Sequence, residues 1–356
     1  MSQRLASFIR QLPKAELHLH IEGTLEPELI FRLAERNKVA LSYPSVEALR
    51  QAYQFTDLQS FLALYYAAMQ VLRTEQDFAD LAEAYFARAR QQGVVHVEMF
   101  FDPQAHMQRG IAFETVIDGL WHACRQSQAT FGMSSTLILC FLRDLSVPSA
   151  METLAHATTY GERIIAVGLD SAEKGHPPSK FRAVFDKARA AGFLTVCHAG
   201  EEGPPAYVWE AINVLQVSRL DHGVRSMEDP ALVAYLARTQ LPLTVCPLSN
   251  VKLGIFPALQ HHNVKQMLAA GLRVTINSDD PAYFGGYVGD NFLAVQDALQ
   301  LTEAQLVELA RNAFLASFIT AGERQRYLAR LEAAYAQHQT ALVEPQARSH
   351  AEAHHR

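Results

Sequence analysis

The chain has 356 residues, of which 49% are hydrophobic, and 31 Lys and Arg against 37 Asp and Glu residues give a formal net charge of −6. This composition supports a large folded core and excludes a disordered chain, and the slight acidity without a basic run argues against a nucleic-acid surface. No run approaches roughly eighteen apolar residues and the N-terminal segment lacks a signal-peptide core, so we expect a cytoplasmic protein without membrane partners.

Eight short apolar runs have the length and the β-branched and aromatic content of buried strands. In chain order they cover residues 15–20, 94–101, 135–142, 164–170, 193–200, 218–224, 241–249 and 272–281. Amphipathic segments such as 77–93 and 178–192 lie between them, and each of these two closes on a glycine. Eight strands alternating with helices predict a parallel sheet, and the number eight favours a closed (β/α)8 barrel.

The remaining segments predict the domain organisation. A long helical insert, roughly residues 24–93, follows the first strand and is expected to cap the C-terminal mouth of the barrel. We expect one domain over residues 1–340, because no linker or repeat interrupts it, and a disordered polar tail over 341–356. The four cysteines form no C-x-x-C pair and are expected to be buried free thiols.

Chemically active side chains gather at the ends of four predicted strands. In a (β/α)8 barrel the active site forms where strands end and loops begin. The residues at these ends are His18 and His20 on the first run, His198 and Glu201 on the fifth, Asp221 and His222 on the sixth, and Asp279 and Asp280 on the eighth. Agreement among four strand ends favours a common site over isolated hydrogen-bonded core residues.

The histidines at these ends predict a metal site. A strand has a period of two, so His18 and His20 project to the same side, into the barrel mouth. Together with His198 and one carboxylate they form a mostly nitrogen set that suits Zn²⁺ and leaves one position open for water. We expect one zinc ion per chain, and zinc held in this way lowers the pKa of its bound water towards neutrality.

Two further residues are candidates for proton transfer. Glu201, three residues after His198, can turn into the pocket and donate a proton, which requires burial to raise its pKa. The alternative is an exposed loop glutamate, and we expect that of its neighbour Glu202. His222 can orient the hydroxide or stabilise its charge.

The motifs KAELHLHIEG (14–23), HAGE (198–201), LDHGV (220–224) and NSDDP (277–281), in this order, resemble those of the adenosine and adenine deaminases. The resemblance runs from about residue 10 to about residue 335. Members of this family are mononuclear zinc hydrolases on a (β/α)8 barrel. The resemblance implies zinc on His18, His20, His198 and Asp279, with Glu201 as the proton donor to the purine ring, His222 at the attacking hydroxide and Asp280 at a ring nitrogen.

Departures from the adenosine deaminase pattern indicate the adenine deaminase branch, which acts on the free base. Glu22 stands where adenosine deaminases usually have an aspartate that holds a ribose hydroxyl, and its longer side chain would intrude on a sugar site. The stretches 168–181 and 278–291 resemble the same branch. We therefore expect deamination of adenine to hypoxanthine and ammonia, with Asp280, Glu22 and the groups from Ser171 to Glu173 binding the base.

Several alternatives stay open. The substrate could instead be adenosine, an N6-substituted adenine or an N6-substituted adenosine monophosphate, although no Lys/Arg cluster accompanies the motifs to bind phosphate. A binuclear amidohydrolase acting on a cyclic amide usually has a lysine at the end of the fourth strand, which here reads Leu169, Asp170 and Ser171. The signature of cytidine deaminases is absent, and a non-catalytic purine-binding module would need no buried acid. The sequence does not fix the oligomeric state.

Overall fold

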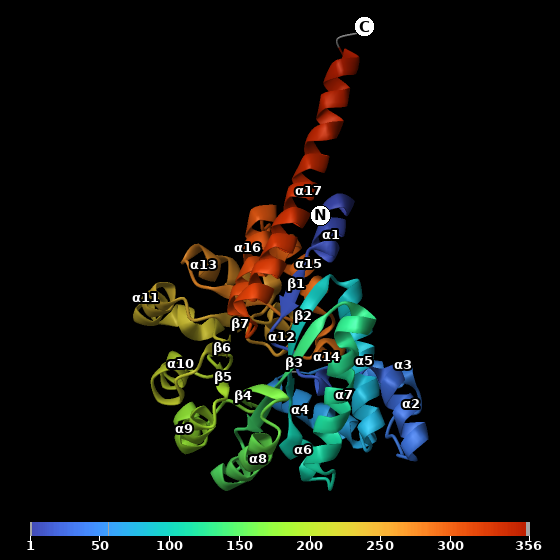
Figure 1. Ribbon diagram of the computed structural model, residues 1–356, viewed down its shortest axis with the longest axis vertical. Helices are drawn as coiled ribbons and strands as arrows, with labels where there is room; N and C mark the ends of the chain where they lie inside the picture. Colours follow the sequence, from blue (N-terminus) through green and yellow to red (C-terminus); the bar gives the residue numbers. More distant parts are fainter. Residues whose placement is uncertain (1, 56, 354–356) are drawn as a thin grey trace.

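Eight parallel strands form a barrel in the order β1 to β8 (Figure 1). The structure is a computed structural model that describes residues 2–55 and 57–353, with side chains described up to residue 341. The strands are β1 Lys14–Glu16, β2 Val94–Phe101, β3 Ser134–Leu142, β4 Ile164–Asp170, β5 Leu194–Ala199, β6 Arg219–His222, β7 Leu243–Val245 and β8 Val274–Ile276. The predicted (β/α)8 barrel is thereby confirmed.

Helices connect the strands and cover the outside of the barrel (Figure 1). The α-helices are α1 Gln3–Gln11, α2 Pro27–Asn37, α3 Val46–Gln51, α4 Leu58–Ala68, α5 Glu75–Gln91, α6 Pro103–Met107, α7 Phe113–Phe131, α8 Val147–Thr159, α9 Arg182–Ala190, α10 Pro205–Glu210, α11 Pro230–Thr239, α12 Pro247–Lys252, α13 Val264–Ala269, α14 Pro281–Phe284, α15 Val288–Leu299, α16 Glu303–Ala316 and α17 Ala321–Ala353. Shorter helical turns are η1 Glu22–Thr24, η2 Met69–Val71, η3 Pro178–Phe181, η4 Ala211–Leu215, η5 Val224–Glu228 and η6 Leu259–His261.

The first strand is shorter than the sequence predicts, because regular pairing stops before His18. The backbone N–H of Leu17 donates to the side-chain oxygen of Asn277 at 2.9 Å, where a regular ladder would offer a backbone carbonyl. Pairing then resumes, since His20 donates its backbone N–H to the carbonyl of Asp279 at 3.0 Å and Leu19 forms a parallel bridge with Asp279. This bridge closes the barrel between its first and last strands and brings the two motifs together.

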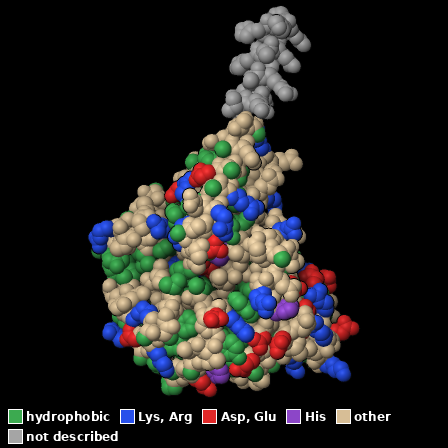
Figure 2. Space-filling model, viewed as in Figure 1, with side chains coloured by type: hydrophobic (Ala, Val, Ile, Leu, Met, Phe, Trp, Pro, Cys, Tyr) green, Lys and Arg blue, Asp and Glu red, His purple; other side chains and the backbone are tan. Residues whose placement is uncertain are grey.

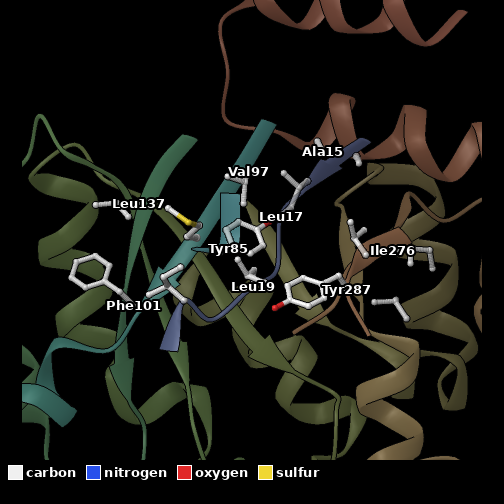
Figure 3. Packing of buried hydrophobic residues seen from close by; sticks show 14 of the residues in the cluster. Ala15, Leu17, Leu19, Tyr85, Val97, Phe101, Leu137, Ile276 and Tyr287 are labelled. Carbon is white, nitrogen blue, oxygen red and sulfur yellow. The ribbon is translucent and has the colours of Figure 1, made fainter. Parts of the chain in front are cut away.

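The alternation predicted for the first run is present despite the interruption. Leu17, Leu19 and Ile21 are fully buried on the side that packs against the surrounding helices, where Tyr85 of α5 lies close by (Figure 3). Burying a leucine side chain of this kind stabilises the fold by about 1.5–3 kcal/mol. The side chains between them, His18 and His20, therefore face the barrel interior.

The helices of the insert after β1 occupy two different places, one outside the barrel and one over its mouth. Helix α5, which the amphipathic pattern over 77–93 predicts, packs on α7 and β2 as the barrel helix that follows the first strand. Helix α4 lines the pocket at the C-terminal ends of the strands with Leu58, Phe61 and Tyr65. Only part of the insert thus lies over the mouth of the barrel.

The opposite, N-terminal face of the barrel carries the C-terminal helix α17 (Figure 1). The hydroxyl of Tyr327 on this helix lies 2.7 Å from Ser134 Oγ at the start of β3. Inside the barrel at this end, Arg219 and Glu98 form a fully buried ion pair with 2.5 Å between Nη1 and Oε2. Helix α17 runs to Ala353, but the side chains of 342–356 lie outside the described residues, so the disordered tail stays a prediction.

Surface and core features agree with the composition. All four cysteines are buried free thiols, as predicted. Within the described ranges, no helix is long and apolar enough to cross a membrane. Figure 2 shows Lys and Arg side chains interspersed with Asp and Glu on the face in view.

Candidate active site

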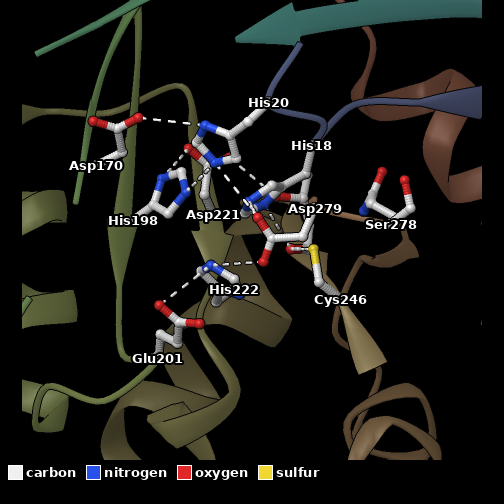
Figure 4. A network of polar contacts seen from close by, with 12 residues as sticks. His18, His20, Asp170, His198, Glu201, Asp221, His222, Cys246, Ser278 and Asp279 are labelled. Carbon is white, nitrogen blue, oxygen red and sulfur yellow. Dashed lines mark hydrogen bonds and ion pairs between the residues drawn. The ribbon is translucent and has the colours of Figure 1, made fainter. Parts of the chain in front are cut away.

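Four side chains of metal-binding type meet at the C-terminal ends of three strands (Figure 4). His18 and His20 follow β1, His198 lies on β5 and Asp279 follows β8, and one ligand atom from each lies within 4.8 Å of the others. Asp279 Oδ1 is 3.3 Å from His18 Nε2 and 3.5 Å from His20 Nε2, and His20 Nε2 is 3.1 Å from His198 Nε2. The structure thus brings together the four residues that the sequence predicts as ligands.

Acidic side chains behind two of the histidines fix their orientation. His20 Nδ1 lies 3.4 Å from Asp170 Oδ2, and His198 Nδ1 lies 3.4 Å from Asp221 Oδ2. A carboxylate that faces Nδ1 favours the tautomer with its proton on that nitrogen, which leaves the Nε2 lone pair free. Both Nε2 atoms then present lone pairs to the centre of the cluster.

His18 is oriented in the same way by a residue on β7. Its Nδ1 lies 2.9 Å from Thr244 Oγ1 and 3.2 Å from the Thr244 carbonyl oxygen. The threonine hydroxyl donates in turn to Asp221 Oδ1 at 3.0 Å, so it is free to accept from the imidazole N–H. Each of the three histidines in the cluster therefore has a polar partner at Nδ1, and Thr244 is the partner of His18.

The cluster fits a divalent cation. His18 Nε2 is buried and has no hydrogen-bond partner among the described residues, and the nearby nitrogens of His20 and His198 are acceptors in the tautomers just described. Burial lowers the pKa of His20 to about 3, which keeps that imidazole neutral. The neighbouring histidines, His18 first, hold the pKa of Asp279 well below its usual value although burial opposes this. Three imidazoles and one carboxylate match the ligand set of a tetrahedral zinc site.

A buried carboxyl group and a fourth histidine border the cluster. His222 Nε2 is 3.5 Å from Glu201 Oε2 and 3.8 Å from Asp279 Oδ2 (Figure 4). Burial, followed by the charges of Asp279 and Glu173, raises the pKa of Glu201 well above its usual value. Burial, followed by the charge of His18, lowers the pKa of His222 well below its usual value. Both shifts favour the uncharged forms, a protonated carboxyl group beside a neutral imidazole.

Three strand-end residues of this site have left-handed backbone conformations. Ser171, His222 and Asp279 have φ angles of 71°, 63° and 66°. For a residue with a side chain this conformation costs about 1–2 kcal/mol, and such strain concentrates at functional sites. Here it turns the chain sharply at the ends of β4, β6 and β8, so that consecutive side chains such as Asp279 and Asp280 take separate positions.

A pocket opens over the cluster. It is lined by side chains from strand ends and from helix α4, namely His20, Leu58, Phe61, Leu62, Tyr65, Tyr66, Asp102, Asp170, Ser171, His198, Glu201, His222, Leu253, Asp279, Asp280 and Phe284. These described lining residues include neither Lys nor Arg. The pocket therefore offers aromatic walls and acidic groups to a ligand, and no cation for a phosphate.

Asp280 is placed in this pocket with little freedom to move. A Cβ atom added to Gly23 would lie 2.0 Å from Asp280 Oδ1, so only glycine allows the carboxyl group its position. Burial, followed by the charge of Asp279, raises the pKa of Asp280 well above its usual value. Its carboxyl group thus lies beside that of Asp279 and lines the pocket.

Glu22 and Glu173, both predicted to bind substrate, are engaged elsewhere and do not line the pocket. Glu22 Oε1 accepts hydrogen bonds from the backbone N–H of Asp102 at 3.0 Å and from His106 Nε2 at 2.8 Å. The Glu173 carboxylate accepts four backbone N–H groups, from Gly200, Glu201, Glu202 and Gly203, at 2.7, 3.1, 2.8 and 2.7 Å. Both carboxylates hold backbone in place. Ser171, in contrast, lines the pocket with its hydroxyl 3.3 Å from the Tyr66 hydroxyl.

Sequence reasoning missed Asp102, the support role of Asp170, and the aromatic side chains of α4. Asp102 follows the last residue of β2, and Asp170 is the last residue of β4. The rule that singled out Asp279 applies equally to both, so their positions at strand ends were the available signal. Sequence periodicity gives no sign that α4 turns Tyr65 and Tyr66 into the pocket.

Comparisons with known proteins identify the family. The sequence model of the family described as Adenosine deaminase matches residues 13–334. The chain is 63% identical over 324 residues to an adenine deaminase of Streptomyces coelicolor, covering 90% of this chain and 95% of that protein. It is 59% identical over 322 residues to an adenine deaminase of Crocosphaera subtropica, covering 90% and 99%.

Solved structures show the same similarity. The crystal structure of an adenine deaminase from Arthrobacter aurescens superposes with a TM-score of 0.89 and 51% identity, covering 90% of this chain and 98% of that chain. An amidohydrolase from Burkholderia ambifaria, solved with bound Zn, shares the fold at a TM-score of 0.89 and 23% identity, covering 97% and 96%. On the evidence of its sequence and its fold, this chain belongs to the adenosine deaminase family.

Proposed function

We propose that this chain hydrolyses adenine to hypoxanthine and ammonia at a single zinc ion held by His18, His20, His198 and Asp279. The observation that carries the proposal is the convergence of three oriented imidazoles and one carboxylate beside the buried acid Glu201. The adenine deaminases that are 59–63% identical over 90% of the chain support adenine as the substrate.

The overall reaction balances with one water molecule. The water oxygen bonds to C6 of the ring and the bond from C6 to the amino nitrogen breaks. Of the two protons of the water, one ends on N1 and the other on the amino nitrogen, which leaves as ammonia. Zinc bound by such a ligand set acts as a Lewis acid and lowers the pKa of water towards neutrality.

Side chains of this protein supply the proton transfers. Glu201, whose pKa is raised well above its usual value by burial, delivers a proton to N1 of the purine ring, which makes C6 more electrophilic. The pKa of His222 is lowered, which favours its neutral form, and its Nε2 lies 3.5 Å from Glu201 Oε2. The imidazole accepts a hydrogen bond from the attacking water and stabilises the charge that develops on the water as its oxygen bonds to C6. Asp280 contacts a ring nitrogen and fixes the orientation of the base.

The lining of the pocket bears on the substrate class. N6-substituted adenosine monophosphates would place a phosphate where the described lining residues provide no cation. Relatives that act on such nucleotides, among them an Arabidopsis N6-mAMP deaminase at 17% identity, share the fold alone. We assign the reaction to purine salvage, and a cytoplasmic location stays a prediction from the sequence.

A matched pair of variants tests the assignment of the acid. Glu201→Gln should retain the metal and bind adenine, yet lose turnover by about 10²- to 10⁴-fold, because an amide cannot deliver the proton. Glu202→Gln is the control, since that neighbouring carboxylate pairs with the exposed Lys174 and lies outside the pocket lining. Metal content by atomic absorption and adenine turnover by ammonia release are measured on both. Near-wild-type turnover in Glu201→Gln would refute the role.

A further inference from the structure

Glu16, the last residue of β1, is a fully buried acidic residue that the chemistry described above does not use. Its Oε1 accepts two hydrogen bonds from Ser278, one from the backbone N–H at 3.1 Å and one from the side-chain hydroxyl. Its Oε2 accepts a third hydrogen bond, at 2.5 Å, from the hydroxyl of Tyr85 on α5. Both oxygens of Glu16 are therefore occupied, and two of the three hydrogen bonds come from one residue.

Ser278, the partner of Glu16, lies between the last strand and a residue of the metal cluster. Strand β8 ends at Ile276, and Asp279 follows Ser278 directly. Ser278 is fully buried, and a buried backbone N–H requires an acceptor. Glu16 is that acceptor, because the regular pairing of β8 ends before Ser278. The carboxyl group of Glu16 therefore holds the backbone at the point where the chain leaves β8.

Side chains join the end of β1 to the end of β8. The backbone N–H of Leu17 donates to Asn277 Oδ1, and the preceding residue, Glu16, accepts from the serine that follows Asn277. Contact between the two backbones resumes at Asp279, whose N–H donates to the His18 carbonyl at 3.1 Å. These contacts set the alignment of the two segments that supply three of the four residues of the metal cluster.

Asp279 needs support from its neighbours because its backbone conformation is unfavourable. Its φ angle of 66° lies in the left-handed region, which a residue with a side chain adopts only when the surrounding structure holds it there. In this conformation Asp279 Oδ1 lies 3.3 Å from His18 Nε2 and 3.5 Å from His20 Nε2. A shift of the preceding residue would move this oxygen away from the two imidazoles.

We infer that Glu16 is a positioning residue for the metal: its two hydrogen bonds to Ser278 hold the Asp279 carboxylate opposite His18 and His20. This inference rests on the zinc site of the proposed function and adds to it a residue that is not among those lining the pocket. Tyr85 binds the second oxygen of Glu16 and thereby fixes the orientation of the carboxyl group. Groups that orient a metal ligand in this way contribute to metal affinity although they do not touch the metal.

The test measures zinc affinity by competition with a chelator, and the stability of the metal-free protein by urea unfolding, in the wild-type protein and in matched variants. Glu16→Ala removes both hydrogen bonds to Ser278 and should weaken zinc binding about 10- to 100-fold, the usual effect of losing a group that orients a metal ligand. Glu16→Gln should bind zinc within about threefold of the wild-type protein, because its amide oxygen can accept from Ser278 while its NH₂ group donates to the Tyr85 hydroxyl oxygen. Tyr85→Phe is the control: it removes the hydrogen bond to Oε2 and lowers stability, and it should leave zinc affinity within about threefold.

A second variant decides the question if Glu16→Ala does not fold. Ser278→Ala removes the hydroxyl bond alone and keeps Glu16, and it should weaken zinc binding about three- to tenfold. Wild-type zinc affinity in Glu16→Ala, or in Ser278→Ala where the first variant does not fold, overturns the inference. An equal loss of zinc affinity in Tyr85→Phe also overturns it, because the effect would then be one of general stability.

Two further outcomes separate this inference from its alternatives. A Glu16→Gln variant that binds zinc as weakly as Glu16→Ala would assign the effect to the charge of Glu16 and overturn the positioning role. A wild-type protein that binds no zinc overturns the proposed site and this inference together. A zinc-loaded wild-type protein that is inactive on adenine overturns the proposed function alone.

Discussion

The four hydrogen bonds to Glu173 predict that Glu173→Gln loosens the loop that carries Glu201. Oε2 of Glu173 accepts three of the backbone N–H groups and Oε1 accepts the fourth, from Gly200. A glutamine has one acceptor oxygen, and its NH₂ group must face at least one N–H. If the amide oxygen takes the place of Oε2, the N–H of Gly200 is left without an acceptor.

The expected loss of stability in Glu173→Gln can be estimated from these four hydrogen bonds. Hydrogen bonds to a charged acceptor contribute about 1.5–3 kcal/mol each, and a buried donor left unpaired costs about 1–3 kcal/mol. With three bonds weakened and one lost, Glu173→Gln should lower the free energy of unfolding by about 2–4 kcal/mol. The Glu173 charge also raises the pKa of Glu201, so its removal lowers that pKa. Because Glu201 acts as an acid, the alkaline limb of the activity profile should move to lower pH.

Urea unfolding and the pH dependence of kcat/KM measure the two effects. Glu202→Gln is the matched control: its charge also raises the pKa of Glu201, but its side chain accepts none of the four N–H groups. It should therefore shift the alkaline limb in the same direction, and because its side chain loses one ion pair to the exposed Lys174, the free energy of unfolding should fall by only about 1 kcal/mol. Wild-type stability and an unmoved alkaline limb in Glu173→Gln would refute this reasoning. A raised KM alone would instead make Glu173 a substrate contact.

Three other substitutions have clear expected outcomes. Asp279→Ala should abolish tight zinc binding, and the wild-type protein should hold one equivalent by metal analysis, so two equivalents in active protein would contradict the single site. Gly23→Ala should displace Asp280, since the added Cβ would lie 2.0 Å from Oδ1, and adenine kcat/KM should drop at least about tenfold with the metal retained. Arg219→Met leaves the buried Glu98 carboxylate with only the His96 ring and the Phe318 N–H as partners, and should cost about 3–5 kcal/mol in urea unfolding at pH 7. Arg219 holds the pKa of Glu98 below its usual value although burial opposes this. The stability that this ion pair contributes is therefore present above pH ~4.5 and is lost as the pH falls through the pKa of Glu98 in the folded protein. An Arg219→Met variant as stable as the wild-type protein would contradict this expectation.

The barrel and the metal cluster were predictable because each depends on a short-range pattern. The apolar runs mark the strands, and the topology of a parallel barrel brings all their C-terminal ends to one face. His18, His20, His198 and Asp279 could therefore be grouped without knowledge of any distance. The extent of β1 was not predictable, because the side chain of Asn277, distant in sequence, replaces a backbone acceptor.

The sequence could not predict which acidic side chains bind backbone N–H groups. Glu22 and Glu173 lie in the segments expected to bind substrate, but their oxygens bind N–H groups of Asp102 and of the loop after β5. Nothing in their local sequence distinguishes an acidic side chain that points into a pocket from one that accepts hydrogen bonds from backbone N–H groups. Asp102 shows the converse, because the strand-end rule points to it, whereas its place in the pocket lining is seen only in the structure.

The most direct measurement is the competition of adenine and adenosine, at equal concentration, for the purified zinc-loaded protein. Ammonia release and the change in ultraviolet absorbance follow the two reactions together. If the pocket is selective for the free base, kcat/KM should be much larger for adenine, and adenosine should be turned over poorly or not at all. Comparable kcat/KM values for the two substrates would contradict the assignment to the free base, and no turnover of adenine would contradict the function itself.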